Sequence, residues 1–270
     1  MSLETQQVKY IQAGLLKVEV HPSSQAAGAA AALAAAETLV QLSKTRKSIG
    51  VIFATGASQL DTLAALTSIE QLPWNQVVGF HMDEYVGISP DHPASFVGYM
   101  RERLVQKVPM GEFTEIDGIA PDPEQTGRDY AAKLSAANPQ LCLLGVGENG
   151  HLAFNDPFVA DFEDPLDAKV VRLDAECRQQ QFAEGWFESV DLVPESAITL
   201  TIPALLRVPR LIVSVPGSRK AKIVRRVLEE ETSTACPATI LRSHPDVTMY
   251  LDLESAGELK EFLAPMNLVS

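Results

Sequence analysis

The stretch LCLLGVGENGHLAFNDP, residues 141–157, joins a short apolar run to a polar segment rich in glycine. An apolar run of this length without polar alternation is typical of a strand that is buried on both faces, as in a parallel sheet. Comparable runs occur at residues 16–20, 49–54, 77–80, 211–215 and 247–251. The sequence therefore predicts one buried sheet built from these strands, with residues 141–146 among them.

Helical patterns lie between the predicted strands. An alanine-rich helix is predicted to run to about residue 42, with Ser23 or Ser24 as its N-cap. Further helices are predicted at residues 95–103, 123–136, 175–188, 218–230 and 255–263. Strands that alternate with helices form a parallel sheet covered on both faces. We therefore predict an α/β fold in one domain of 270 residues: an open, mostly parallel sheet with helices on both faces, a Rossmann-like arrangement of three layers.

The chain carries a strong acidic surplus. It contains 22 lysines and arginines against 35 aspartates and glutamates, which gives a net charge of −13. Such a charge repels nucleic-acid backbones and anionic membrane surfaces, so we expect neither nucleic acid nor a membrane as a partner. Hydrophobic residues make up 46% of the chain, which is enough for a packed core. The composition leaves a small-molecule ligand as the expected partner, and it leaves a homo-oligomer open.

Two further features favour a cytoplasmic location. The apolar stretch at residues 26–36 is mostly alanine and too short to cross a bilayer, and no basic segment followed by an apolar one marks a secretory signal. The three cysteines, Cys142, Cys177 and Cys236, form no C-x-x-C pair. An odd number of unpaired cysteines fits a reducing compartment.

Four polar segments follow predicted strands directly. They are residues 55–58 (TGAS), 81–84 (HMDE), 145–151 (GVGENGH) and 216–220 (PGSRK). Ligands of open α/β sheets bind outside the carboxyl ends of the strands. We therefore expect these four segments to meet at one site.

Two of these segments resemble anion-binding junctions between a strand and a helix. Free N–H groups at a helix N-terminus, together with hydroxyl groups, can hold a phosphate, and a lysine in the first turn can add a positive charge. The residues that would do so are Thr55, Gly56, Ala57, Ser58 and Lys220. Neither segment is a Walker A loop. An ordinary tight turn and a solvated lysine are the alternative interpretations.

Asp83 and His151 are the candidates for acid–base chemistry. A carboxylate just past a strand can be a general base, a metal ligand or a helix cap. Glu148 and Asp156 lie close enough in sequence to orient the His151 ring, although a structural histidine is the alternative. Only His81 lies near Asp83 as a second metal ligand, so we expect no metal. We interpret the site as one for proton transfer on a small anion.

The motifs that carry these residues follow one another in a characteristic order. They are MDEYVG at residues 82–87, GVGENGHLAFNDP at residues 145–157, GSRKA at residues 217–221 and LRSHP at residues 241–245. Over about residues 15–255 this order resembles the glucosamine-6-phosphate deaminase (isomerase) family, in the superfamily that includes 6-phosphogluconolactonase.

The resemblance implies a reaction and a role for several residues. Asp83 would move a proton from C2 to C1 of the open-chain amino sugar, and His151 would promote opening of the sugar ring. The products would be fructose 6-phosphate and ammonia, formed without a metal or an organic cofactor. The segment at residues 55–58 and Lys220 would hold the phosphate of this sugar-phosphate substrate.

The chain departs from the family's pattern at several places. Asn149 stands where many members have an acidic residue, and Asp156 stands where the family has a glutamate. A phosphate-clamping arginine has no direct counterpart: Gln181 aligns with it, and Arg178 one turn earlier is the nearest candidate.

These departures keep other functions open. The alternatives are a 6-phosphogluconolactonase-like hydrolase, a non-catalytic sugar-phosphate-binding protein of the same fold, and an isomerase that does not deaminate. The acidic stretch at residues 156–167 is interpreted as either a solvated loop or a lid beside the site.

Overall fold

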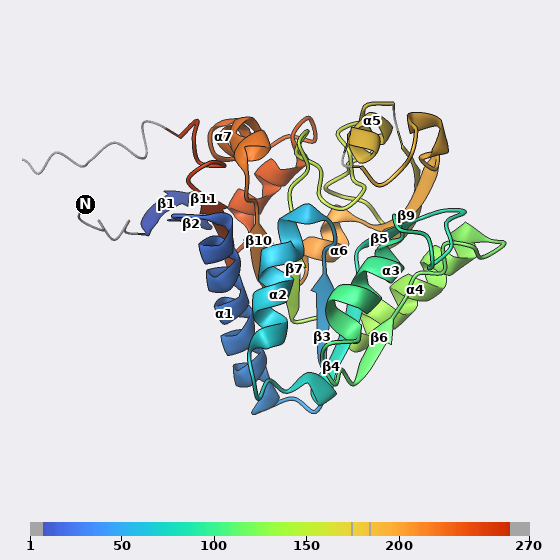
Figure 1. The fold of residues 1–270 in the computed structure, drawn as a ribbon, viewed down its shortest axis with the longest axis horizontal. Helices are drawn as coiled ribbons and strands as arrows, with labels where there is room; N and C mark the ends of the chain where they lie inside the picture. Colours follow the sequence, from blue (N-terminus) through green and yellow to red (C-terminus); the bar gives the residue numbers. More distant parts are fainter. Residues whose placement is uncertain (1–7, 174, 184, 260–270) are drawn as a thin grey trace, which may run out of the picture.

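The structure, a computed structural model, describes residues 8–173, 175–183 and 185–259. Its main feature is an eight-stranded sheet (Figure 1). From one edge to the other the order is β1 (Lys9–Ala13), β2 (Leu16–His21), β11 (Val247–Asp252), β10 (Arg210–Ser214), β7 (Leu141–Leu144), β3 (Ile49–Phe53), β4 (Val77–His81) and β6 (Glu112–Thr114). All neighbours are parallel except β1 and β2, which form an antiparallel pair. The predicted mostly parallel sheet is confirmed, and each of the six predicted strands is present.

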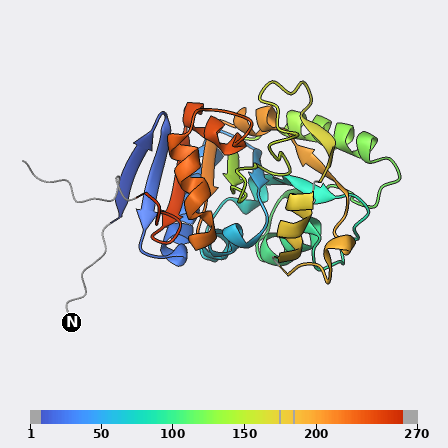
Figure 2. The ribbon, with the colours of Figure 1, turned by 90° about the horizontal axis from the view of Figure 1, so that it is seen from above.

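Helices cover both faces of this sheet. On one face α1 (Ser24–Ser43), α2 (Leu60–Ser68) and α3 (Phe96–Met100) pack against the strands. On the other face lie α4 (Pro123–Ala137), α6 (Ile202–Leu206) and α7 (Ala221–Glu229). Seen from above, the light-green α4 and the cyan α2 lie on opposite sides of the sheet (Figure 2). The predicted three layers are therefore confirmed, while the expectation of a single domain stays a prediction.

Helix α1 is a core helix. The Ser23 hydroxyl accepts a hydrogen bond from the Ala26 N–H at 3.2 Å, so the predicted N-cap is confirmed. By length and composition alone, this helix is long and apolar enough to cross a membrane. The expectation that the apolar stretch at residues 26–36 is too short to do so was wrong. Its alanine-lined face is buried against the sheet and α2. At Gly28 the two helices are so close that a Cβ atom would lie 2.6 Å from the Asp61 Cβ, so only glycine fits there.

A second, smaller sheet was not predicted. Its order is β5 (Asp83–Tyr85), β9 (Ser196–Leu200) and β8 (Ala168–Arg172), and both pairs are antiparallel. β5 is only three residues long and starts two residues after β4, so its pattern merges with that of the preceding strand. All six predicted strands lie in the eight-stranded sheet, and this second sheet is an addition to it.

The remaining predicted elements differ mainly in length. The helix predicted at residues 175–188 is α5 (Ala175–Ala183), which ends earlier, and residues 255–259 form turns rather than the start of a helix. The rest of that predicted helix lies outside the described residues. Residues 156–167 contain no helix or strand, as predicted, and the three cysteines are buried and form no disulfide among the described residues.

Candidate active site

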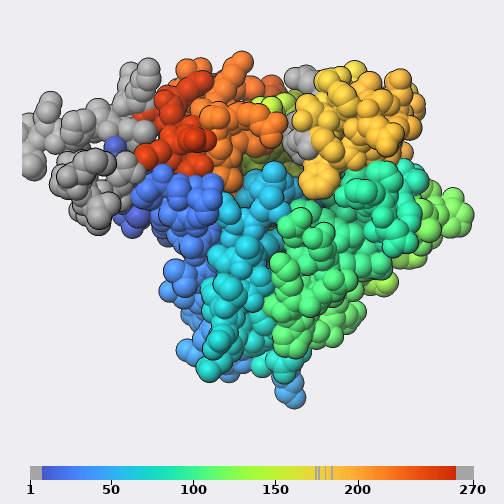
Figure 3. Space-filling view, viewed as in Figure 1, coloured from blue at the N-terminus to red at the C-terminus, as the bar shows by residue number. Residues whose placement is uncertain are grey.

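A cavity of about 420 Å³ opens at the carboxyl ends of the parallel strands. All four predicted segments contribute to its lining, through residues 55–58, 82–83, 145–147 with His151, and 216–220. The gold segment that follows α5 lies over the green region of α3 at this end of the molecule (Figure 3). Two side chains from the α5 region, Gln181 and Trp186, also line the cavity. The expected convergence of the four segments is thus present.

Asp83, the first residue of β5, lies in this cavity with only 6% of its surface exposed. Burial, and then the neighbouring charge of Glu84, raise the pKa of the Asp83 carboxyl well above its usual value. Burial therefore favours the protonated form of this carboxyl group more than in an exposed aspartate, and the group lies where it can exchange a proton with a bound molecule.

Glu84, by contrast, is a structural cap. Its carboxylate accepts hydrogen bonds from the Ser95 hydroxyl at 2.7 Å and from the Val97 N–H at 2.9 Å, at the N-terminus of α3. It also accepts from the Phe96 N–H at 3.2 Å. Of the two adjacent carboxylates, the helix-cap interpretation thus applies to Glu84 and leaves Asp83 open to the cavity.

His151 is oriented by two partners. Its Nδ1 lies 3.0 Å from Asp156 Oδ1, and the same oxygen accepts a hydrogen bond from the Asn149 amide at 2.7 Å. The Asn149 Oδ1 accepts in turn from the His151 N–H at 3.0 Å. Because the carboxylate is an acceptor only, Nδ1 carries a proton, and the neutral ring of this tautomer has Nε2 as an acceptor on the wall of the cavity.

Asp156 is fully buried. Burial alone would raise the pKa of its carboxyl, but the hydrogen bonds and charge of His151, together with Asn149 and Cys177, outweigh that effect and lower it. The carboxyl group therefore stays ionised through the working pH range. The predicted histidine–carboxylate pair is present, although aspartate is one methylene shorter than glutamate.

Gly147 makes room for the His151 ring. A Cβ atom at this position would lie 2.2 Å from the imidazole, which no side chain could accommodate. Gly150 has a φ of 92°, a conformation that favours glycine, and its N–H donates to the Gly147 carbonyl at 3.0 Å. The two glycines thus shape the loop so that its histidine points into the cavity.

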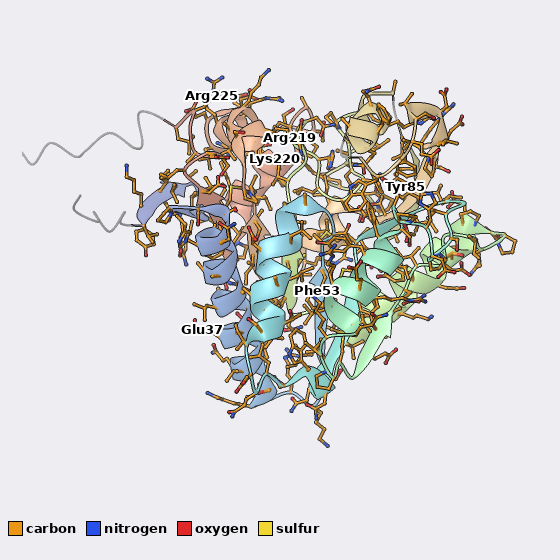
Figure 4. The ribbon with its side chains drawn as sticks, viewed as in Figure 1. Glu37, Phe53, Tyr85, Arg219, Lys220 and Arg225 are labelled. Carbon is orange, nitrogen blue, oxygen red and sulfur yellow. The ribbon has the colours of Figure 1, made fainter. Side chains whose placement is uncertain are left out.

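Two matching junctions form the candidate phosphate site. Gly56 (φ 89°) precedes a short helical turn, Ala57–Gln59, that leads into α2, and Gly217 (φ 93°) precedes Ser218–Lys220, which leads into α7. The first N–H groups of such turns have no acceptor within the helix and favour anions. Arg219 and Lys220 project at the start of α7 (Figure 4), where Arg219 pairs with Glu148 at 3.5 Å.

Two residues that support these junctions were missed in the sequence. The Tyr99 hydroxyl donates to the Gly56 carbonyl at 3.0 Å, and both carboxylate oxygens of Asp252 accept from the Gly217 N–H at 3.0 and 3.1 Å. Both residues line the cavity. Asp252 directly follows the strand predicted at residues 247–251, so its position was a signal, whereas nothing local marked Tyr99.

Arg178 lies outside the cavity lining. Its guanidinium group donates to the carbonyls of Val193 at 3.1 Å and Val190 at 3.0 Å, and thereby ties α5 to the next turn. Gln181, one turn further along α5, lines the cavity instead, and its Oε1 accepts from the Tyr85 hydroxyl at 2.7 Å. We therefore leave Arg178 out of the proposed phosphate site.

His81, which the sequence offered as a metal ligand beside Asp83, is a core residue. It is fully buried, and its Nε2 accepts from the Ile116 N–H at 2.9 Å. Burial lowers the pKa of His81 to about 3, so the ring is neutral. Within the described part of the chain, no group of three or more histidine, cysteine, aspartate or glutamate residues is arranged to hold a metal ion.

Known proteins resemble this chain over most of its length. The profile of the family "Glucosamine-6-phosphate isomerases/6-phosphogluconolactonase" matches residues 22–154. A glucosamine-6-phosphate deaminase of Exiguobacterium sibiricum is 35% identical over 210 residues, which are 77% of this chain and 80% of the relative. One from Bacillus cereus is 33% identical over 221 residues, 82% of each protein.

Solved structures agree with these matches. A monomeric glucosamine-6-phosphate deaminase superposes with a TM-score of 0.82 at 30% identity, over 89% of this chain and 99% of the other. A 6-phosphogluconolactonase from Shewanella baltica superposes with a TM-score of 0.72 at 18% identity, over 87% and 96% of the two chains. At that identity the second likeness concerns the fold alone.

Proposed function

The chain belongs to the family of glucosamine-6-phosphate isomerases and 6-phosphogluconolactonases, and on that premise we propose that it converts glucosamine 6-phosphate to fructose 6-phosphate and ammonia. The observation that carries this proposal is a single cavity with three elements: a buried carboxyl group on Asp83, the His151–Asp156 pair, and the two anion-binding junctions. A phosphorylated sugar needs all three at once. The chain is thus an enzyme of this superfamily.

Asp83 acts as the base in the proposed reaction. Its carboxylate takes the proton from C2 of the open-chain sugar and returns it to C1, while a proton of the amino group passes to the C1 oxygen, so that C1 becomes a hydroxymethyl carbon and C2 an imine. The imine left at C2 is then hydrolysed by water, with release of ammonia. A carboxyl with a raised pKa suits both halves of this transfer, because catalytic groups work best with a pKa near the operating pH.

His151 serves the ring-opening step. With Nδ1 bonded to Asp156, its Nε2 can accept the proton of the sugar's anomeric hydroxyl and pass it to the ring oxygen. Asn149 supports this role, because its amide fills a second acceptor position on Asp156 and its Oδ1 fixes the His151 backbone. We therefore assign Asn149 and Asp156 to positioning His151.

The phosphate is held by the two junctions. Backbone N–H groups and hydroxyls of residues 55–58 surround it on one side, and Lys220 supplies a positive charge on the other. Such a local site accommodates one phosphate group despite the acidic surplus of the whole chain. The proposed ligand is small, and no nucleic acid or membrane enters this function; a cytoplasmic location and the oligomeric state stay predictions.

A panel of substrates tests the proposal. Purified protein is incubated with glucosamine 6-phosphate, its N-acetylated form, mannosamine 6-phosphate, glucose 6-phosphate and 6-phosphogluconolactone, and ammonia, ketose and lactone hydrolysis are measured separately. We expect ammonia and fructose 6-phosphate from the first compound. Absence of ammonia from every hexosamine 6-phosphate would refute deamination, and lactone hydrolysis alone would show the hydrolase alternative.

The proposed base predicts the acid limb of the pH profile. Because the pKa of Asp83 is raised, its carboxylate form is lost as the pH falls through a value above the ordinary aspartate range. We expect kcat/KM for glucosamine 6-phosphate to fall with decreasing pH well before pH 4, where an exposed carboxyl (pKa about 3.9) would titrate. A ¹³C-carboxyl NMR titration, with the Asp83 signal identified by its absence in Asp83→Asn, separates this group from the substrate phosphate. A midpoint at or below about pH 4 would contradict the assignment.

Replacement of Lys220 by methionine tests the phosphate site. A lost hydrogen bond to a charged group costs about 1.5–3 kcal/mol, so we expect KM for glucosamine 6-phosphate to rise about 10- to 100-fold with a smaller change in kcat. Lys222→Met is the matched control, because Lys222 starts the same helix but does not line the cavity. Equal KM values for the two variants would remove Lys220 from the site.

A further inference from the structure

The second, smaller sheet connects the strand that begins with Asp83 to the loop that carries His151. Its middle strand, β9, pairs with β5, and Thr199 is the direct partner of Asp83 in that ladder. The next residue continues the connection, because the Leu200 N–H donates to the Met82 carbonyl at 2.8 Å. Residues 199–200 therefore fix the backbone position of the proposed base.

The same two residues hold the histidine loop. The Thr199 hydroxyl accepts a hydrogen bond from the Phe154 N–H at 3.1 Å and donates to the Leu200 carbonyl at 3.1 Å. The Asn155 amide donates to that same Leu200 carbonyl at 2.8 Å and to the Leu152 carbonyl at 2.8 Å. Thr199 is fully buried, so its hydroxyl cannot exchange these partners for water.

The loop needs this support because its backbone is strained. Ala153 has a φ of 52°, a left-handed conformation that residues other than glycine rarely adopt. It lies two residues after His151 and lines the cavity. A strained turn persists only where its surroundings hold it, and here the hydrogen bonds at Phe154 and Asn155 are the nearest restraints.

We propose that Thr199 is a positioning residue that sets the placement of the His151 loop relative to Asp83. This inference rests on the proposed function, since it assigns Asp83 and His151 to successive steps on one substrate. The base and the ring-opening group come from different parts of the chain, and the hydroxyl of Thr199 is where β9 links them. The small sheet then serves catalysis, because it fixes the position of the His151 ring relative to the Asp83 carboxyl.

Thr199→Val tests this role, because valine has the same shape but lacks the hydroxyl. We expect kcat for ammonia release to fall about 10- to 100-fold, as for a small misplacement of a catalytic group, with KM for glucosamine 6-phosphate within about threefold. Thr199→Ser, which restores the hydroxyl, should recover kcat to within about threefold of the unaltered chain.

Thr201→Val is the matched control. Thr201 is equally buried and close to the end of β9, but its hydroxyl donates to the Leu166 carbonyl at 2.7 Å and accepts from the Ala204 N–H at 3.4 Å, away from the histidine loop. The Thr201→Val variant therefore loses a hydroxyl that caps α6, while the hydrogen bonds of the histidine loop stay in place. We expect its melting temperature to fall and its kcat to stay within about twofold.

Hydrogen–deuterium exchange gives a readout that does not depend on the substrate. In Thr199→Val the Phe154 amide should exchange about tenfold faster or more, while Thr201→Val leaves it unchanged. If the unaltered chain releases no ammonia, the proposed function fails while the exchange result still decides whether Thr199 holds the loop. An unchanged kcat in Thr199→Val, unchanged exchange at Phe154, or equal kcat losses in the two variants would overturn the inference. Should the valine variant not fold, Thr199→Ala removes the same hydroxyl and is measured in its place.

Discussion

Replacing Asp83 with asparagine is expected to lower kcat for ammonia release from glucosamine 6-phosphate by about 10²- to 10⁴-fold, the range that general acid–base groups contribute. Asparagine has the same shape but cannot take up the C2 proton. The neighbouring carboxylate of Glu84 cannot replace it, because that carboxylate is occupied by hydrogen bonds at the N-terminus of α3. The loss should therefore appear in kcat at every pH.

The same substitution should leave folding intact. Since burial raises the pKa of the Asp83 carboxyl, the folded chain already favours its neutral form, and a neutral amide adds no charge to be buried. We expect a melting temperature within about 2 °C of the unaltered chain, the shift produced by a few tenths of a kcal/mol. Binding of glucosamine 6-phosphate should also persist, because the phosphate junctions at Gly56 and Gly217 are untouched.

Asp61→Asn is the matched control for the loss of a carboxylate from this cavity. Asp61 lines the same cavity in the first turn of α2, and it has no part in the proposed proton transfer. Its kcat should stay within about threefold. If Asp83→Asn keeps more than about a tenth of the kcat, proton transfer by this residue is excluded.

The position of the site was predictable because it depends on the topology of the sheet. Parallel strands place their carboxyl ends at one edge, so the segments after β3, β4, β7 and β10 meet whatever the details of packing. Asp83 and His151 lie in the cavity for this reason. The order of apolar runs and polar segments was enough to find both.

The supporting contacts were not predictable, because they join residues that are distant in sequence. The Tyr99 hydroxyl meets the Gly56 carbonyl, and Thr199 meets the Phe154 N–H, only after the sheets have formed. The contacts of Arg178 were not predictable either, although its place in a helix was. The resemblance to the family suggested a phosphate contact for it, yet the packing of α5 turns Gln181 toward the cavity and leaves the arginine to bind carbonyls.

Asp156→Asn is the second substitution with a large expected effect, a loss in kcat of about 10²- to 10³-fold. The carboxylate is an acceptor only, and its Oδ1 takes hydrogen bonds from both His151 Nδ1 and the Asn149 amide. An amide in its place removes the negative charge and brings two donor hydrogens to a buried position. The His151 ring then loses the partner that keeps its proton on Nδ1, and Nε2 is no longer fixed as the acceptor for the sugar hydroxyl.

Asp164→Asn separates this loss from a general effect on the loop. Asp164 lies in the same stretch of chain and pairs with Lys169 at 2.7 Å, so its replacement breaks an ion pair without reaching the histidine. We expect kcat of this control within about threefold, as for a substitution outside the site.

The pH dependence adds a second criterion. Because the pKa of Asp156 is lowered, the unaltered chain loses this carboxylate only when the pH falls below the ordinary aspartate range, whereas the amide variant lacks it at every pH. The kcat of Asp156→Asn should therefore not recover anywhere between about pH 5 and 9, and recovery within that range would show that His151 acts without its carboxylate partner.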